Sequence, residues 1–197
     1  MSNLAQSKPE CGVVESRRRF VAVTGCLGAA VAAFLPLWQR AKGAPAAASL
    51  GTEDRIALAL ARFRGGFHCS QSVLEAYAAD IGLDAELARR LAAALAGGST
   101  VGGECGVMGS AYLILGTKYA GDLPAYGDTA LEERLWSRVR RFVAEFRRRN
   151  GAINCRELLG VDAFTKEGRE EALRRDLFAV RCPKYIRDGI EILDSLD

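Results

Sequence analysis

Residues 128–151 read DTALEERLWSRVRRFVAEFRRRNG, and this stretch decides the fold class. Its apolar side chains recur every three or four residues and would line one face of a helix: Leu131, Leu135, Val139, Phe142, Val143 and Phe146. That spacing is typical of a helix that buries one face against other helices. Almost every segment after residue 52 has the same period, and none alternates as a strand would.

The sequence therefore predicts an all-α, compact bundle of about six to eight helices. The expected helices span residues 53–64, 69–81, 85–96, 105–119, 128–150, 166–180 and 183–196, with a short turn after Cys155. We expect Asp84 and Thr165 to cap the helices that follow them. Pro183 fits the first position of the last helix, which makes Cys182 its expected N-cap.

A glycine-rich link at residues 97–103 joins two of these helices. It lacks the preceding strand and the final Gly-Lys-Ser/Thr of a phosphate-binding loop, so a nucleotide site is not expected. We expect its glycines to let backbone N–H groups approach the sulfur of Cys105 closely.

Residues 1–48 are expected to be a signal peptide and linker, followed by a single domain at 49–197. Arg17 and Arg18 precede Phe20 and an apolar run from Val21 to Leu37, and small residues at 46–48 offer a cleavage site. This arrangement resembles a twin-arginine (Tat) signal, which implies export to the periplasm through the Tat translocon. The alternative is a protein anchored in the membrane by an uncleaved leader. The run is rich in Ala and Gly and weakly hydrophobic, which favours a removed signal and no stable membrane span in the mature form.

The formal charge of +3 comes from the leader. Residues 49–197 hold 21 of the 27 basic residues and 22 of the 24 acidic ones, which leaves a formal charge of −1. Nucleic-acid-binding proteins usually present a concentrated basic face, so no nucleic-acid partner is expected. The basic run Arg147-Arg148-Arg149 ends a long helix, where cations complement the helix dipole.

Four cysteines remain beyond the leader, and each stands at the start of an expected helix: Cys69, Cys105, Cys155 and Cys182. Unpaired N–H groups at a helix N-terminus stabilise a thiolate, the form that binds metal or attacks a disulfide. A lone cysteine is more often a small buried hydrophobe. No Cys-x-x-Cys pair occurs, which disfavours thioredoxin-type sites and zinc ribbons. His68 is the single histidine, which excludes sites built on several imidazoles. It adjoins Cys69 in the sequence and could exchange a proton with that sulfur.

The spaced cysteine segments resemble the family named for its motif, C_GCAxxG_C_C, a group of small redox-active proteins. The matching segments are FHCSQSVL at 67–74, GGECGVMGSA at 102–111, CRELLG at 155–160 and CPKY at 182–185. The chain departs from the motif where Val107 replaces the usual Ala and Ser110 replaces the closing Gly, which should shift helix packing locally. Some relatives are similar to a domain of split-Soret cytochromes, which implies an iron–sulfur centre.

Three functions follow from these residues. In the first, all four cysteines ligate one iron–sulfur cluster for electron transfer or redox sensing. In the second, two of them form the exchanging pair of a thiol-disulfide oxidoreductase without a cofactor. In the third, the protein is not catalytic, and its cysteines form structural disulfides or a closed zinc site. The sequence identifies neither a substrate nor the redox partner.

The paired arginines allow a test of the leader. Replacing Arg17 and Arg18 together with lysine should leave the precursor in the cytoplasm, because the twin-arginine receptor recognises the two guanidinium groups. Immunoblots of the periplasmic and cytoplasmic fractions measure this outcome. Undiminished periplasmic accumulation of the double variant would contradict the prediction.

Overall fold

A computed structural model describes residues 49–121 and 129–196. Across these residues the chain forms eight α-helices and no strands, which confirms the predicted all-α fold. All of the described residues belong to one compact unit, and the predicted signal peptide lies outside them. Within the described part, no helix has both the length and the apolar character needed to cross a membrane.

The first half of the described chain follows the predicted pattern closely. In order, its elements are α1 (Thr52–Arg64), α2 (Cys69–Ala76), η2 (Ala79–Ile81), α3 (Ala85–Ala92), η3 (Ala93–Leu95), η4 (Gly98–Gly102) and α4 (Gly106–Tyr119). Asp84 caps α3 as expected, since its Oδ1 accepts a 2.8 Å hydrogen bond from the N–H of Leu87. The helix expected at 69–81 is broken into α2 and a short 3₁₀ turn that ends at Gly82, where φ is +71°.

The second half contains α5 (Thr129–Asn150), α6 (Cys155–Leu159), α7 (Lys166–Arg174) and α8 (Leu177–Asp194). Thr165 caps α7 by accepting a hydrogen bond from the N–H of Gly168, as predicted. The predicted boundary of the last helix is wrong. Asp176, with φ of +53°, separates α7 from α8, and Pro183 lies inside α8 instead of at its start. The buried Leu177 and Cys182 pack in the same apolar cluster, which favours a helix that already begins at Leu177.

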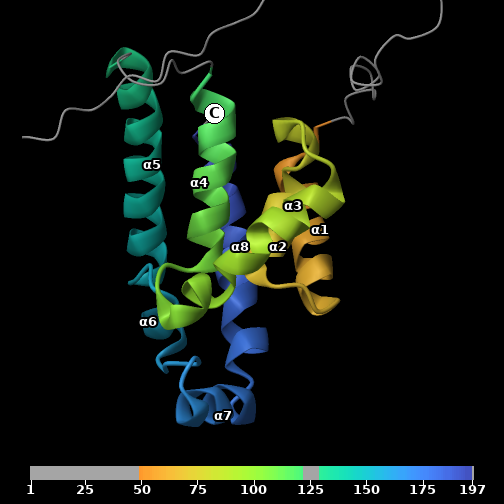
Figure 1. Cartoon of the computed structure of the whole chain (residues 1–197), viewed down its shortest axis with the longest axis vertical. Coiled ribbons are helices and arrows are strands. Elements are labelled where there is room, and N and C mark those ends of the chain that lie inside the picture. Colours follow the sequence, from red (N-terminus) through yellow and green to blue (C-terminus); the bar gives the residue numbers. More distant parts are fainter. Residues whose placement is uncertain (1–48, 122–128, 197) are drawn as a thin grey trace, which may run out of the picture. The chain divides into compact units, whose positions relative to one another are not determined.

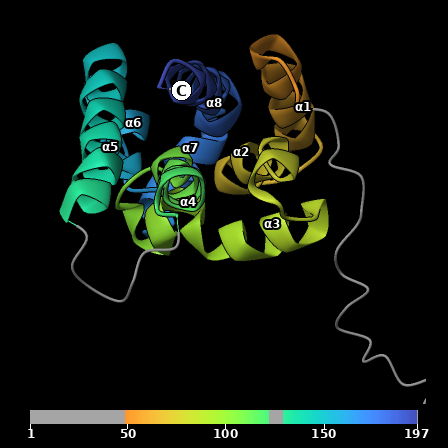
Figure 2. The same cartoon turned by 90° about the horizontal axis from the view of Figure 1, so that it is seen from above.

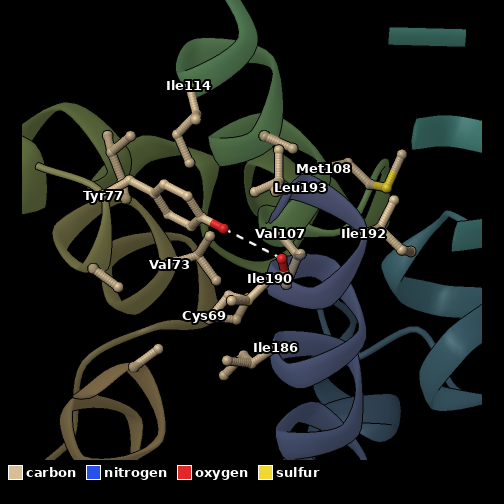
Figure 3. Close-up of a cluster of buried hydrophobic side chains, with 14 of the residues drawn as sticks. Cys69, Val73, Tyr77, Val107, Met108, Ile114, Ile186, Ile190, Ile192 and Leu193 are labelled. Carbon is tan, nitrogen blue, oxygen red and sulfur yellow. Dashed lines mark hydrogen bonds between the residues drawn. The ribbon is translucent and has the colours of Figure 1, made fainter. Parts of the chain in front are cut away.

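Helix α8 is central to the packing. It runs behind α4 in Figure 1, and the view from above in Figure 2 places it between α5 and α1. Its contacts involve six helices: α1, α2, α4, α5, α6 and α7. Figure 3 shows its Ile186 and Ile190 beside Cys69, and the hydroxyl of Tyr77 donating to the carbonyl of Ile190 at 3.2 Å. The core between α2, α4 and α8 therefore surrounds the first of the four cysteines.

A buried ion-pair group ties the first helix to the last. Arg55 of α1 pairs with Asp80 and, at 3.0 Å, with Asp194 of α8. The Tyr77 hydroxyl donates to Asp194 at 2.7 Å, and the Arg55 guanidinium lies 4.5 Å from the centre of the Tyr77 ring. Because Arg55 is buried with its partners, removing either carboxylate would leave charge poorly compensated in the interior.

The closest approach of α8 to α4 requires a glycine. A Cβ on Gly189 would lie 2.2 Å from Cγ1 of Val107, a residue with no exposed surface. We therefore expect Gly189→Ala to destabilise the protein by about 1–3 kcal/mol in urea unfolding, because overpacking forces stiff neighbours apart.

Gly116→Ala is the matched control, since a Cβ there meets nothing within 4 Å. This helix-interior substitution should stabilise α4 by about 0.5–1 kcal/mol. Equal unfolding free energies for the two variants would show that the α4–α8 contact tolerates a methyl group.

Candidate functional site

Three of the four cysteines stand at helix starts, as predicted. Cys69 is the first residue of α2, Cys105 is the N-cap of α4, and Cys155 is the first residue of α6. Cys182 is the exception, because α8 begins five residues before it. All four are free thiols and are 9% exposed or less.

The sulfur of Cys69 accepts several hydrogen bonds. The thiol of Cys105 donates to it, as do the backbone N–H groups of Ser70, Gly106 and Gly97. The Cys105 thiol contributes most, and together these donors outweigh burial and lower the pKa of Cys69. Among the four cysteines, Cys69 is therefore the one whose pKa is lowered.

Gly106 makes this arrangement possible. A Cβ at this position would lie 2.9 Å from the Cys69 sulfur and 2.9 Å from Cβ of Ser70. A side chain there would push α4 away from α2 and withdraw the N–H of Gly106 from the sulfur. Glycine at the first position of α4 therefore allows one helix N-terminus to act on a cysteine of another helix.

Cys105 has the opposite character. Its hydrogen bond to Cys69, its burial and the neighbouring Cys69 sulfur raise its pKa well above the ordinary value. The prediction that the glycine-rich link serves Cys105 is therefore corrected, because the N–H of Gly97 points to Cys69 instead. Cys105, the N-cap of α4, is itself a donor in this group, because its thiol donates to the Cys69 sulfur.

Backbone pairing holds Cys105 next to Cys155. The N–H of Cys105 donates to the carbonyl of Ile153 at 2.8 Å, and the N–H of Cys155 donates to that of Gly103 at 2.7 Å. This short antiparallel bridge, centred on Glu104 and Asn154, joins segments far apart in the sequence. Burial, followed by the Cys69 sulfur and Asp162, raises the pKa of Cys155 to about 12.

Cys182 completes the group from the second turn of α8. Burial, then the sulfurs of Cys69 and Cys155, raises its pKa. The ring of Tyr185, one turn further on, lies near both Cys182 and Cys105 and fixes its hydroxyl on the carbonyl of Leu158 at 2.8 Å. The sulfurs of Cys69, Cys155 and Cys182 therefore influence one another's pKa values, and the predicted arrangement of all four sulfurs around one centre stays a prediction.

The cysteines also divide into two packing groups. Cys69 and Cys105 belong to the main apolar core, whereas Cys155 and Cys182 share a second cluster with Leu159, Ala163, Ala172 and Leu177. Within residues 49–121 and 129–196, no group of three or more His, Cys, Asp or Glu side chains is placed to hold a metal ion. His68 is exposed as the N-cap residue of α2.

The two departures from the family motif have structural roles. Ser110 is buried, and its hydroxyl donates to the carbonyl of Ser70 at 2.7 Å, which links α4 to the residue after Cys69. Val107 fills the space over Gly189.

The glycine-rich link contains a feature that the sequence pattern did not predict. Four consecutive residues have left-handed φ angles, from Gly97 to Thr100, and Gly102 follows with φ of +69°. Ser99 and Thr100 carry side chains, and left-handed helical backbone costs about 1–2 kcal/mol for each such residue. Strain of this kind persists only where surrounding contacts fix the backbone. The run of glycines was the one sequence signal for left-handed backbone in this link. The residue types of Ser99 and Thr100 gave no such signal.

The thiol of Cys105 is predicted to control the ionisation of Cys69. In reduced, metal-free protein, Cys105→Ala should raise the pKa of Cys69, because the strongest donor to its sulfur is lost. The pH dependence of iodoacetamide labelling, mapped to Cys69 by mass spectrometry, gives this pKa. Cys105→Ser keeps a donor and should show a smaller change, whereas an unchanged profile in both variants would refute the role of Cys105.

Comparison with known proteins agrees with this geometry. The family model described as "Putative redox-active protein (C_GCAxxG_C_C)" matches residues 67–196, which include all four cysteines and α2 through α8. Neither curated proteins nor solved structures gave a match. The chain belongs to the C_GCAxxG_C_C family of redox-active proteins.

Proposed function

We propose that Cys69, Cys105, Cys155 and Cys182 form one redox centre that ligates an iron–sulfur cluster for electron transfer or redox sensing. The observation that carries the proposal is that four buried cysteines from four separate helices influence one another's pKa values, with the pKa of Cys69 lowered by hydrogen bonds to its sulfur. When bound, the cluster would supply one-electron chemistry that thiols alone do not provide.

The residues fit a cluster better than a single ion. A cluster of two irons takes two protein ligands on each iron, so it requires two pairs of sulfurs instead of one group around a common centre. Cys69 and Cys105 form one pair through their hydrogen bond, and Cys155 and Cys182 occupy a common apolar cluster. The backbone N–H groups of Ser70, Gly97 and Gly106 would donate to the ligand sulfur of Cys69, and such bonds adjust the potential of a cluster.

Burial of the four sulfurs supports the same proposal. As thiols, Cys105, Cys155 and Cys182 have raised pKa values, so deprotonating them in an apolar setting is unfavourable without a cation to compensate. Iron would provide that compensation and displace the thiol protons. The apolar surroundings would also limit solvent access, which is another determinant of cluster potential.

A second candidate, thiol-disulfide exchange, is supported by the hydrogen bond between Cys105 and Cys69. The Cys69 thiolate would attack a disulfide of a partner, and the departing partner thiolate would take the proton of Cys105. The Cys105 sulfur would then attack the mixed disulfide and release the second partner sulfur as a thiolate, which takes a proton from water to complete the partner dithiol. The two thiols are thereby oxidised to one disulfide, and the partner disulfide is reduced by the same two electrons.

Metal analysis separates the two candidates. Full-length protein made anaerobically with sufficient iron should be coloured and contain iron and acid-labile sulfide. Replacing any one of the four cysteines with serine should lower both contents at least about tenfold, because serine is a weak substitute for a thiolate ligand. Cys26→Ser, outside the described residues and in the predicted leader, is the matched control and should leave both contents unchanged.

The other results are equally decisive. Colourless protein whose free-thiol count falls by two on oxidation would exclude the cluster and support exchange by Cys69 and Cys105. Colourless protein that contains zinc, or whose thiol count does not respond to oxidants, would show that the cysteines are structural.

A further inference from the structure

Arg156 connects the cysteine centre to the left-handed turn at residues 97–102. It directly follows Cys155 and is exposed, yet its guanidinium reaches two successive carbonyls of the turn. Its Nε donates to Gly102 O at 3.1 Å, and its Nη2 donates to Val101 O. Its Nη1 lies 3.6 Å from Oδ2 of Asp162. A planar guanidinium can make all of these contacts at once, whereas an ammonium group cannot match this fork.

Contacts around the turn leave little freedom for other arrangements. A Cβ on Gly102 would meet Cβ of Arg156 at 3.3 Å, and one on Gly98 would lie 2.3 Å from the carbonyl oxygen of Gly103. The N–H of Gly103 closes the turn on the carbonyl of Gly98 at 3.1 Å. Arg156 thus packs along the turn with its stem and binds the carbonyls with its head group.

The same turn contacts Cys69. Its first residue, Gly97, donates its backbone N–H to the Cys69 sulfur. The ring of Phe164 lies against Gly97, where a Cβ would be only 2.0 Å from Cζ. The position of the turn therefore determines a hydrogen bond to a buried sulfur.

We infer that Arg156 is a positioning residue of the redox centre, which fixes the left-handed turn beside Cys69 and keeps the N–H of Gly97 on its sulfur. This inference rests on the proposed function only for its electrochemical consequence. An N–H donor stabilises the more negative, reduced form of a sulfur centre, so releasing the turn lowers the midpoint potential. Releasing the turn also loosens the contacts beside this buried sulfur.

The test compares Arg156→Gln with Arg156→Lys, and with Arg169→Gln as the matched control at an exposed arginine of α7. Reduced full-length protein is treated with iodoacetamide at fixed pH, and the rate of labelling at Cys69 is followed by peptide mapping. Loss of the two carbonyl contacts in Arg156→Gln should raise this rate about tenfold, as expected when a segment in contact with a buried side chain opens more often. Arg156→Lys should recover part of the protection, and Asp162→Asn, which spares the carbonyl contacts, should behave nearly as the parent protein.

Midpoint potentials of the same variants supply the second measurement, on the cluster if iron is present and on the dithiol if it is not. A lower potential in Arg156→Gln alone, together with faster labelling of Cys69, supports the inference. Unchanged labelling in Arg156→Gln would overturn it, as would an equal rise at all four cysteines accompanied by lower thermal stability. Because labelling needs no cluster, failure of the proposed iron site would leave this result interpretable.

Discussion

A sulfur anion in the protein interior is stable only if hydrogen-bond donors replace the water it has lost. At Cys69 those donors come from one neighbouring thiol and three backbone N–H groups, contributed by α2, the start of α4 and the left-handed turn. The arrangement requires α2 and α4 to approach within the distance that Gly106 permits. The hydrogen bonds of Ser110 and Ser70, which fasten α4 to α2 and α2 to the carbonyl of Ala92, maintain the same approach.

Much of this fold could be predicted because amphipathic period and helix caps are local properties. The stripe in residues 128–151 corresponds to α5, whose Phe142 and Phe146 are fully buried, and Asp84 caps the helix that follows it. The helix starts at Cys69, Cys105 and Cys155 were predictable for the same reason. A pattern confined to neighbouring residues is sufficient for such features.

The rest depends on contacts between distant segments, which local pattern does not encode. Proline often occupies the first position of a helix, so Pro183 predicted a helix that begins there. In the structure α8 begins six residues earlier, at Leu177, because Leu177 is buried in the same apolar cluster as Cys182. The lowered pKa of Cys69 depends in part on Gly97 and Gly106, which lie far from it in sequence. Likewise, nothing in Ser99 or Thr100 indicates left-handed backbone, because the surrounding contacts impose that conformation.

The central position of α8 has a consequence for how the protein is made. This helix is the last of the described helices to be synthesised, yet it supplies Cys182 and the face against which α1, α2, α4 and α5 pack. Its Asp194 also completes the ion pairs of Arg55, near the beginning of the described chain. Helices synthesised earlier can form individually, but they lack their common packing partner until α8 has been made. The four cysteines therefore come together only after α8 has been synthesised, and a chain truncated before α8 would keep three of these four cysteines and lack the central helix of the core.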